Sequence, residues 1–296
     1  MLTKKLSLRS MRTLKSDSDL GVKAASGLVK VGNTFYVIAD DEVSLAEFNF
    51  EGHTTARYIR LLGATLPVDP VARKKQKPDW ESLIQLKLAD DKNILLAVPS
   101  GSTENRMTGA FVYTNNSAPF TVDFSALYSA LKVKLPELNI EGACILNDKL
   151  KLFQRGNGAA GKNAVIDLDL KGFCSDLSRG VPIAEKNLLA IHDYDLGHFN
   201  GYKLDFTDAC AVNDSIWFLA VSEQSQSTYD DGKYCGAVIG CLDSSGKEIA
   251  RYEIDCATKP EGLWVELEQQ RICFYVVTDA DSTTIYSSIY FGKLLL

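Results

Sequence analysis

Acidic residues recur at one place in a repeated pattern of apolar runs. A short run with an acid near its start opens four of the repeats, at Glu81, Glu141, Asp208 and Glu261, and a weaker copy begins near Ser26. A second apolar run follows each start and ends in polar residues, which are Asp40, Asp41, Ser100, Ser102, Arg155, Asn157, Glu223, Asp279 and Asp281. Carboxylates that face one another repel unless a cation or an arginine lies among them. These residues therefore predict a binding site for a cation, an anion or both.

Oxygen ligands that come from different strands suit calcium or magnesium better than zinc. The opposite interpretation is structural: Glu141 and Glu261 would accept backbone N–H hydrogen bonds between neighbouring units, with Arg155 as their salt-bridge partner. Arg106 and Lys259 lie close to the same places in the sequence. For the cluster as a whole we favour a ligand site, and for any single residue both interpretations stay open.

Other catalytic patterns are weak in the sequence. It has no Gly-x-Ser-x-Gly elbow, no glycine-rich phosphate loop and no dinucleotide fingerprint. Its seven cysteines form no Cys-x-x-Cys pair, which argues against a zinc site and against a disulfide framework. We expect the cysteines to be small buried side chains in a reducing compartment.

Pairs of strands must position the polar residues. In the clearest repeat, residues 138–143 read as one strand, Asn147 and Asp148 as a turn, and 150–157 as a second strand with a polar end. Because the two strands of such a hairpin are antiparallel, the start of the first lies beside the end of the second. We therefore expect the polar residues of all repeats to meet at one end of the molecule.

The spacing of the repeats predicts the architecture. They begin near residues 26, 81, 141, 208 and 261, at intervals of 53 to 67 residues, which is the period of β-propeller blades rather than of helical solenoids. The last repeat has only three strands, and an isolated strand at 5–14 supplies its fourth. We therefore predict an all-β fold, a single β-propeller domain over residues 1–296 with five blades, closed by the N-terminal strand. Six blades remain the alternative, with one hidden in 173–204, and a short helix is expected at 125–134.

The charge and hydropathy of the chain limit its partners. The formal net charge is -6, and only 73–77 gathers basic residues, next to Pro78, where a solvated loop is the better interpretation. Nucleic acid is not expected as a partner, because its binding needs a basic surface with stacking groups. No apolar run approaches the roughly 18 residues of a membrane span, and no apolar core of a signal peptide follows the basic N-terminus. We expect a cytoplasmic protein that does not bind membranes.

Several motifs together resemble a bacterial family of phytase-like (esterase-like) β-propellers with no assigned activity. These motifs cover the chain from Pro78 onward and are 140–143, 154–157, 198–201, 206–209, 227–232 and 259–263. The wider relatives, esterase-like phytase domains and calcium-dependent lactonase propellers, hold a divalent cation with an inner-strand glutamate and a second-strand aspartate. By this resemblance Glu141, Glu261 and Asp279 are predicted metal ligands. The sequence departs from the pattern at Arg155, which stands where an acid is expected and could meet an anionic group.

Two functions of different classes are consistent with these residues. In the first, a cation-assisted hydrolase acts on a small anionic ester, phosphoester or lactone in the central channel, where the metal polarises the substrate or activates water. Its catalytic residues would be Glu141, Arg155 and Glu261, and its ligand-binding residues would be Glu81, Arg106, Asn157, Asp208 and Glu223. In the second, a non-catalytic propeller binds a small ligand or a protein on the same face. A protein partner could also bind a rim formed by 173–204 and 224–233.

Overall fold

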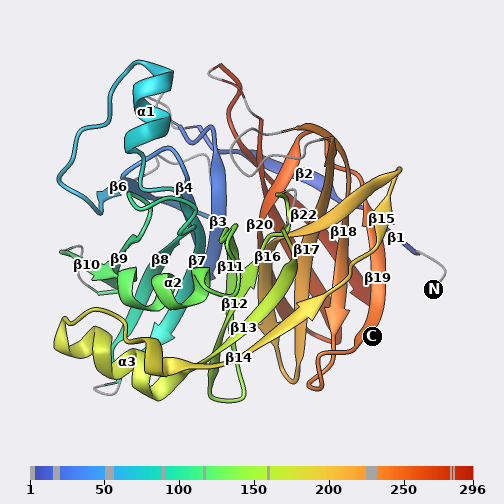
Figure 1. Ribbon diagram of the computed structural model, residues 1–296. Helices are drawn as coiled ribbons and strands as arrows, with labels where there is room; N and C mark the ends of the chain where they lie inside the picture. Colours follow the sequence, from blue (N-terminus) through green and yellow to red (C-terminus); the bar gives the residue numbers. More distant parts are fainter. Residues whose placement is uncertain are drawn as a thin grey trace.

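Five β-sheets surround a central channel in the computed structural model of the chain (Figure 1). The structure describes residues 4–15, 21–50, 57–88, 91–115, 118–158, 161–224, 232–280, 282 and 284–295. Each innermost strand contacts the next one around the ring, and these strands are β3 (Ala25–Val31), β7 (Trp80–Lys87), β11 (Ile140–Leu146), β16 (Tyr202–Val212) and β20 (Lys259–Glu268). The arrangement confirms the predicted all-β, five-bladed propeller.

Every blade continues outward from its inner strand by antiparallel pairing. The second strands are β4 (Thr34–Ala39), β8 (Asn93–Pro99), β12 (Lys149–Gln154), β17 (Ser215–Gln224) and β21 (Arg271–Asp279). The third strands are β5 (Ser44–Asn49), β9 (Thr108–Tyr113), β13 (Asn163–Asp169), β18 (Lys233–Leu242) and β22 (Ser288–Leu295). The fourth strands are β6 (Arg57–Arg60), β10 (Pro119–Asp123), β14 (Leu188–Tyr194), β19 (Glu248–Ile254) and β2 (Arg9–Thr13).

The segment that could have hidden a sixth blade belongs to the third and fourth blades. It contains α3 (Leu170–Arg179), a 3-10 turn (Glu185–Asn187), strand β14 of the third blade and the short β15 (His198–Phe199), which pairs with β16. The six-bladed alternative is therefore wrong.

The N-terminal segment closes the ring, but it does so with two strands instead of one. Strand β2 pairs antiparallel with β22 and completes the fifth blade, as predicted from the sequence. The preceding β1 (Lys4–Leu6) pairs parallel with β19 of the fourth blade. Leu6 is 4% exposed and packs in the apolar core between these two blades. The segment therefore provides the outer strand of the fifth blade and also pairs with the fourth blade, so it connects the two blades.

Apolar side chains fill the space between neighbouring blades. Phe206 of the fourth blade meets Phe153 of the third edge to face, with ring centroids 5.2 Å apart, and meets Phe218 of its own blade at 5.3 Å. Because both faces of a blade are covered, its central strands read as continuous apolar runs rather than as alternating ones. All seven cysteines lie in the described part of the chain, and all are free thiols, six of them buried.

Every inner strand carries a one-residue β-bulge at the same rung, which we call the bulge rung. The extra residue has no partner in the ladder and is Ser26, Glu81, Glu141, Thr207 or Glu261. A bulge redirects the side chain of its extra residue, and here the three glutamates are directed into the mouth of the channel. The two hydroxyls bind the next blade instead: Ser26 Oγ donates to Trp80 O at 2.5 Å and Thr207 Oγ1 to Pro260 O at 3.3 Å.

A glycine follows the bulge in three of the five inner strands, and close packing explains it. A Cβ on Gly142 would lie 2.8 Å from the Cα of Asp208 and 3.0 Å from the amide nitrogen of Ala209 in the adjacent inner strand. Such contacts are too short for a Cβ, so at this position the third blade can lie this close to the fourth only because the residue is glycine. The Glu-Gly pairs of the sequence thus combine a channel-facing acid with a site of close contact between blades.

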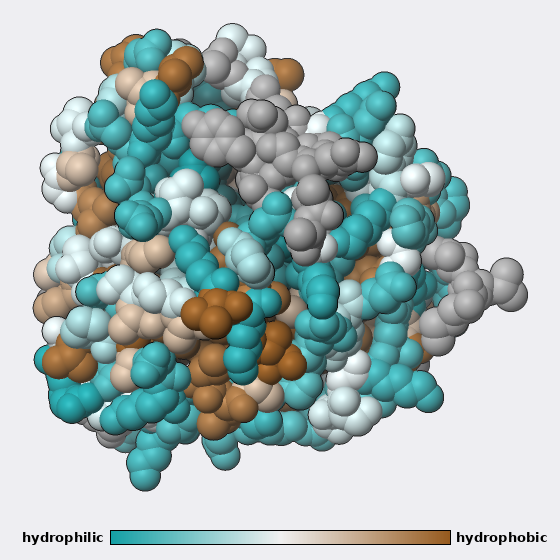
Figure 2. Space-filling model, in the orientation of Figure 1, coloured by the Kyte–Doolittle hydropathy of each residue, from teal (hydrophilic) through white to brown (hydrophobic). Residues whose placement is uncertain are grey.

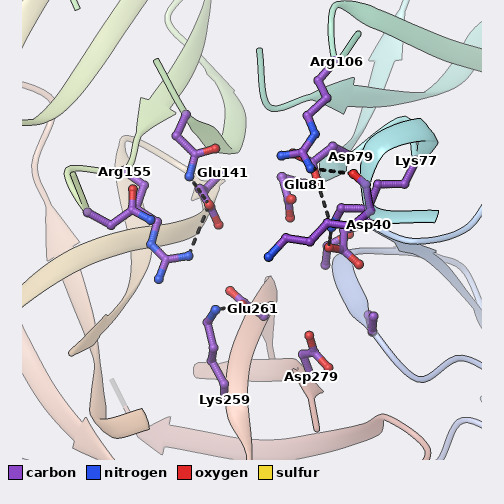
Figure 3. A pocket seen from close by; sticks show the side chains of 16 residues that line it. Asp40, Lys77, Asp79, Glu81, Arg106, Glu141, Arg155, Lys259, Glu261 and Asp279 are labelled. Atoms are coloured by element: carbon purple, nitrogen blue, oxygen red, sulfur yellow. Dashed lines mark hydrogen bonds and ion pairs between the residues drawn. The ribbon is translucent and has the colours of Figure 1, made fainter. Parts of the chain in front are cut away.

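Two short helices lie in the connections between blades: one joins the first blade to the second, and the other joins the second blade to the third. Helix α2 (Ser125–Lys132) confirms the predicted short helix at 125–134. Helix α1 (Pro70–Gln76) begins after Asp69, whose carboxylate accepts a hydrogen bond from the amide of Ala72 at 2.8 Å. This helix replaces the solvated loop predicted at 73–77, and the chain leaving it carries Lys77 toward the channel (Figure 3).

The face of the molecule seen in Figure 2 is largely hydrophilic, with an apolar patch at its lower middle. Exposed apolar side chains from the elements in this region are Val133 after α2, Val181 after α3 and Leu189 in β14. Among the described residues, no helix is long and apolar enough to cross a membrane.

Candidate functional site

Charged side chains line a cavity of about 60 Å³ at the mouth of the channel, where inner strands begin and second strands end (Figure 3). The carboxylates in its lining are those of Asp40, Asp79, Glu81, Glu141, Glu261 and Asp279. The cationic groups are those of Lys74, Lys77, Arg106, Arg155 and Lys259. The mouth is therefore a mixture of nearly balanced charges, not the predominantly acidic site that the repeats alone suggest.

Asp79 organises the side of the mouth that belongs to the first two blades. It is 3% exposed, and its carboxylate pairs with Lys77 Nζ at 2.9 Å and with Arg106 at 2.9 Å. Ser100 Oγ, at the end of the second strand, donates to the same carboxylate at 2.5 Å. Lys77 also donates to Asp40 and so joins the two blades. Asp79 has a φ of +57°, a conformation that aspartate tolerates better than most residues.

A chain of ion pairs spans the other three blades. Arg155 contacts Glu141 at 3.3 Å and Glu223 at 2.5 Å, and Lys259 contacts Glu223 at 2.9 Å and Glu261 at 2.6 Å. All five residues are buried in the structure or nearly so, which strengthens each pair relative to a surface pair. The chain places one bulge-rung glutamate at each end and a shared acid, Glu223, at its centre.

Glu141 has a second fixed contact. The side-chain amide of Asn139 donates to Glu141 Oε1 at 2.6 Å, and the same oxygen faces Arg155. The structural interpretation from the sequence expected backbone amides here, whereas the observed donors are side chains. Burial raises the pKa of Glu141, and the positive charges of Arg155 and Lys259 oppose that rise.

Glu81 lies between the two networks and differs from the other bulge-rung acids. Among the described residues, none forms a hydrogen bond or an ion pair with its carboxylate, although Lys77 is near enough to act on it electrostatically. Burial in the channel raises the pKa of Glu81 well above its ordinary value, and the charges of Asp79, Glu141 and Asp40 raise it further. Glu81 is therefore the bulge-rung acid whose charged form is least compensated by its described neighbours.

Glu261 also has a raised pKa, chiefly because it is buried, but its neighbour Lys259 stabilises the charged form. Two carboxyl groups in one small site with different surroundings can act in opposite senses, one as a proton donor and one as a base. In this mouth Glu81 fits the donor and Glu141, which is held by a cation and an amide, fits the base.

One group of acids has the spacing of a metal site. Single carboxylate oxygens of Asp40, Asp79 and Glu81 all lie within 4.8 Å of one another. This trio is not the predicted set of Glu141, Glu261 and Asp279, in which the first two carboxylates face Arg155 and Lys259. The ammonium group of Lys77 already bridges Asp40 and Asp79, so a divalent cation would compete with it.

Most of the residues predicted for the site do meet at the mouth. Glu81, Arg106, Glu141, Arg155, Asn157, Glu261 and Asp279 all line the cavity. Glu223 lies behind it, in contact with two of its cations, and lines a second cavity. Asp281 lies outside the described residues, as do 225–231 of the predicted rim and most of the motif at 227–232.

Asp208 is placed one residue away from the bulge rung. Its carboxylate is 2% exposed and accepts hydrogen bonds from the amides of Ala209 at 2.8 Å and Leu263 at 2.7 Å. The equivalent of Glu141 in this blade is Thr207, because the register shift falls between Phe206 and Asp208. Asp208 therefore ties the fourth blade to the fifth and lies outside the lining of the mouth.

Four polar residues of the mouth, which are Lys74, Lys77, Asp79 and Asn139, escaped the sequence interpretation. The basic run at 73–77 gives no sign that a helix turns its end toward the channel. The place of Asp79 in the repeat could have identified it. It stands two residues before the bulge-rung residue Glu81, just as Asn139 and Lys259 stand two residues before Glu141 and Glu261. Each of these three side chains contacts a charged group of the mouth.

Comparison with solved structures supports the propeller fold. The chain is similar to a candidate glycoside hydrolase from Bacteroides ovatus ATCC 8483, with a TM-score of 0.52 and 13% identity over 97% of this chain and 93% of the other. It is also similar to the tail fiber of Staphylococcus aureus phage P68, with a TM-score of 0.53 and 10% identity over 98% of this chain and 53% of the other. At such low identity the likeness concerns the fold alone.

No curated protein sequence matches the chain. One family model does, and its match to residues 21–294 spans all five blades. The chain therefore belongs to the family of unknown function DUF6929.

Proposed function

We propose that the channel mouth is the active site of a hydrolase for a small anionic ester, phosphoester or lactone. The observation that carries this proposal is the state of Glu81, an acid without a partner among the described residues in a cavity where the other bulge-rung glutamates are paired. Such a carboxyl group is destabilised in its charged form and can supply a proton to a leaving oxygen. Structural acids are normally paired, so an isolated one is a candidate for catalysis.

The other charges of the mouth have complementary roles in this proposal. Water attacks the substrate, Glu141 accepts the proton of that water, and Glu81 gives its own proton to the oxygen that leaves. Arg106 and Arg155 bind the anionic group of the substrate, since guanidinium groups pair with carboxylates and phosphates through two parallel hydrogen bonds. The resemblance to phytase-like and lactonase propellers favours ester, phosphoester and lactone bonds.

With a divalent cation bound, the ligands would be Asp40, Asp79 and Glu81 rather than the trio predicted from the sequence, and Glu81 would then be a charged ligand instead of the proton donor. All three offer the oxygen ligands that calcium and magnesium prefer. The cation would supply Lewis-acid polarisation of the substrate. Its binding would depend on displacement of the Lys77 ammonium group, which makes calcium affinity a testable property of the wild-type mouth.

The test is a turnover screen with wild-type protein and two variants. The panel holds chromogenic esters, phosphate mono- and diesters and lactones, together with aryl glycosides because of the similar candidate glycoside hydrolase, each assayed with calcium and with chelator. Glu81→Gln is expected to lower turnover by about 10²-fold or more, as for loss of a general acid. Glu185→Gln, an exposed acid on the 3-10 turn, is the matched control. Equal turnover in wild type and Glu81→Gln would refute the role of Glu81.

The second candidate is a non-catalytic propeller that binds a small anion or a protein. The observation that favours it is the small volume of the mouth, about 60 Å³, in which most charges already have protein partners. Anion binding by calorimetry without turnover of any substrate in the panel would support it. A protein partner would be sought on the apolar patch seen in Figure 2. The seven free thiols are consistent with the cytoplasmic location that we propose for either function.

A further inference from the structure

A second, larger cavity lies beside the mouth, between the third and fourth blades. We call it the side cleft; its volume is about 650 Å³, and its lining comes from 156–158, from the β15–β16 hairpin and from the end of β17. Pockets of roughly 300–1,000 Å³ are typical of sites for small organic ligands. The mouth is about a tenth as large, so an organic substrate with its reactive bond at the mouth needs room elsewhere for its remaining atoms.

Asn157 connects the two cavities, because its side chain lines both. The loop that presents it is fixed at both ends. The amide of Gly156 donates to Asn163 Oδ1 at 3.1 Å, and Lys203 Nζ donates to the carbonyl oxygens of Gly156 at 2.7 Å and Gly161 at 3.1 Å. Asn163 is fully buried, so this support is rigid. The position of Asn157 at the junction is therefore a built feature of the fold.

The charges that line the side cleft are compensated by the protein itself. Lys203 pairs with Asp205 at 3.2 Å, and Glu223 is shared between Arg155 and Lys259. Among the described residues of the lining, a charged ligand group would therefore find these charges already paired. A neutral ligand group would fit, because burying it requires no counter-charge.

Two side chains show what kind of neutral group the side cleft accepts. Asn157 Oδ1 is buried and, within the described residues, accepts no hydrogen bond. A ligand that donates a hydrogen bond to it would remove the free-energy cost of a buried acceptor without a donor. Tyr202 is half-buried and presents an apolar ring with a polar hydroxyl at its tip. A ring with C–H faces and several hydroxyl groups satisfies both, since its hydroxyls donate to the amide oxygen and its carbons pack on the aromatic ring.

We propose that the side cleft binds a neutral, polyhydroxylated group, the part of the substrate that leaves after hydrolysis, with Asn157 as the residue that determines specificity. The orientation of the substrate in this inference rests on the proposed hydrolase, because the anionic group then occupies the mouth and the neutral group extends past Asn157 into the side cleft. Binding in the side cleft, however, can be measured without any turnover. The two ideas therefore fail separately.

The experiment is ligand-observed NMR on the full-length protein with myo-inositol and a set of neutral disaccharides as probes. Wild-type protein is expected to bind at least one of them, and Asn157→Ala to weaken that binding about fivefold through loss of one hydrogen bond. Tyr202→Ala tests the contribution of the aromatic ring independently, whereas Tyr202→Phe keeps the ring and should retain most of the affinity. Asn93→Ala is the matched control, because Asn93 is an exposed asparagine at the far end of β8.

The outcomes separate the two proposals. Glu81→Gln should bind the probe as well as wild type does, because Glu81 lines the mouth and not the side cleft. Probe binding that persists in a protein without turnover would leave the side cleft supported and the hydrolase refuted. No binding of any polyhydroxylated probe by wild type, or equal binding by wild type, Asn157→Ala and Tyr202→Ala, would overturn the assignment of the side cleft.

Discussion

Replacing Glu81 by glutamine is expected to make the protein more stable, although it removes the residue on which catalysis is proposed to depend. The change keeps the shape of the side chain and removes a carboxylate that is repelled by three other acids and has no hydrogen-bond or ion-pair partner among the described residues. A buried polar group without a partner costs about 1–3 kcal/mol, and more when it is charged. An unfolding entropy of about 2.1 cal/mol/K per residue gives about 0.6 kcal/mol/K for 296 residues, so 1–3 kcal/mol corresponds to a rise in Tm of roughly 2–5 °C at pH 8.

The pH dependence follows from the direction of the pKa shift. The folded pKa of Glu81 is raised above the unfolded value, which is about 4.3 for a free glutamate. The folded state therefore holds its proton more tightly, so the contribution to stability is complete below pH 4 and is lost as pH rises through the folded pKa. Glutamine does not titrate, so the difference in Tm between variant and wild type should be small at pH 4 and should widen toward pH 8.

The assay is thermal unfolding followed by circular dichroism at several pH values between 4 and 9. Glu141→Gln serves as the opposite case, because its carboxylate is bound by Arg155 and Asn139, and its loss should lower stability by about 1–3 kcal/mol. Glu185→Gln should change nothing. If Glu81→Gln lowers Tm at pH 8, or if its effect does not vary with pH, then Glu81 is a paired structural acid and the reasoning for its catalytic role is wrong.

Three further predictions test the metal trio, the contact between blades and the closure of the ring. Lys77→Met should lose about 3–5 kcal/mol of stability because Asp40 and Asp79 lose the ammonium group that bridges them, and calcium should restore stability in this variant more than in wild type; equal calcium effects on Tm would count against a cation site there. Gly142→Ala should cost about 1–3 kcal/mol in urea unfolding, whereas Gly63→Ala, with open space around it, should be neutral, and similar values would show that the inner strands can separate easily. Leu6→Ala should cost about 2–5 kcal/mol, against little for the exposed Leu295→Ala, and a silent Leu6→Ala would mean that β1 contributes nothing to closure.

The architecture could be predicted because it rests on local, repeated chemistry. The pairs Glu141-Gly142 and Glu261-Gly262 each mark the bulge rung of an inner strand, where the close approach of a neighbouring blade requires glycine. The missing strand of the last unit and the isolated strand at the N-terminus complement one another in the sequence. The division of that N-terminal strand into β1 and β2 was not visible, because the parallel pairing of Leu6 with Ile254 depends on how two blades are placed side by side.

The composition of the mouth was predicted only in part, since it depends on contacts between distant residues. The acids could be found from the repeat. In the fourth blade, however, the residue equivalent to Glu141 is Thr207, and Asp208 stands one position later, where its side chain lies on another face of the strand. Lys77 could not be placed, because its approach to Asp40 and Asp79 follows from the path of α1 over the channel. The predicted metal ligands stay a prediction, and calcium titration of wild-type protein is the direct test.

The bulge rung also bears on how such a protein can diverge. Its residues take no part in the pairing of the strands, so replacing one of them leaves every rung of the ladder in place. The present chain uses three carboxylates and two hydroxyls at these five positions. Selection could therefore change the chemistry of the channel one blade at a time, by point mutations that leave the strand ladder paired even where they remove a side-chain contact, and a library randomised at these five codons would sample new specificities on the same five-bladed scaffold.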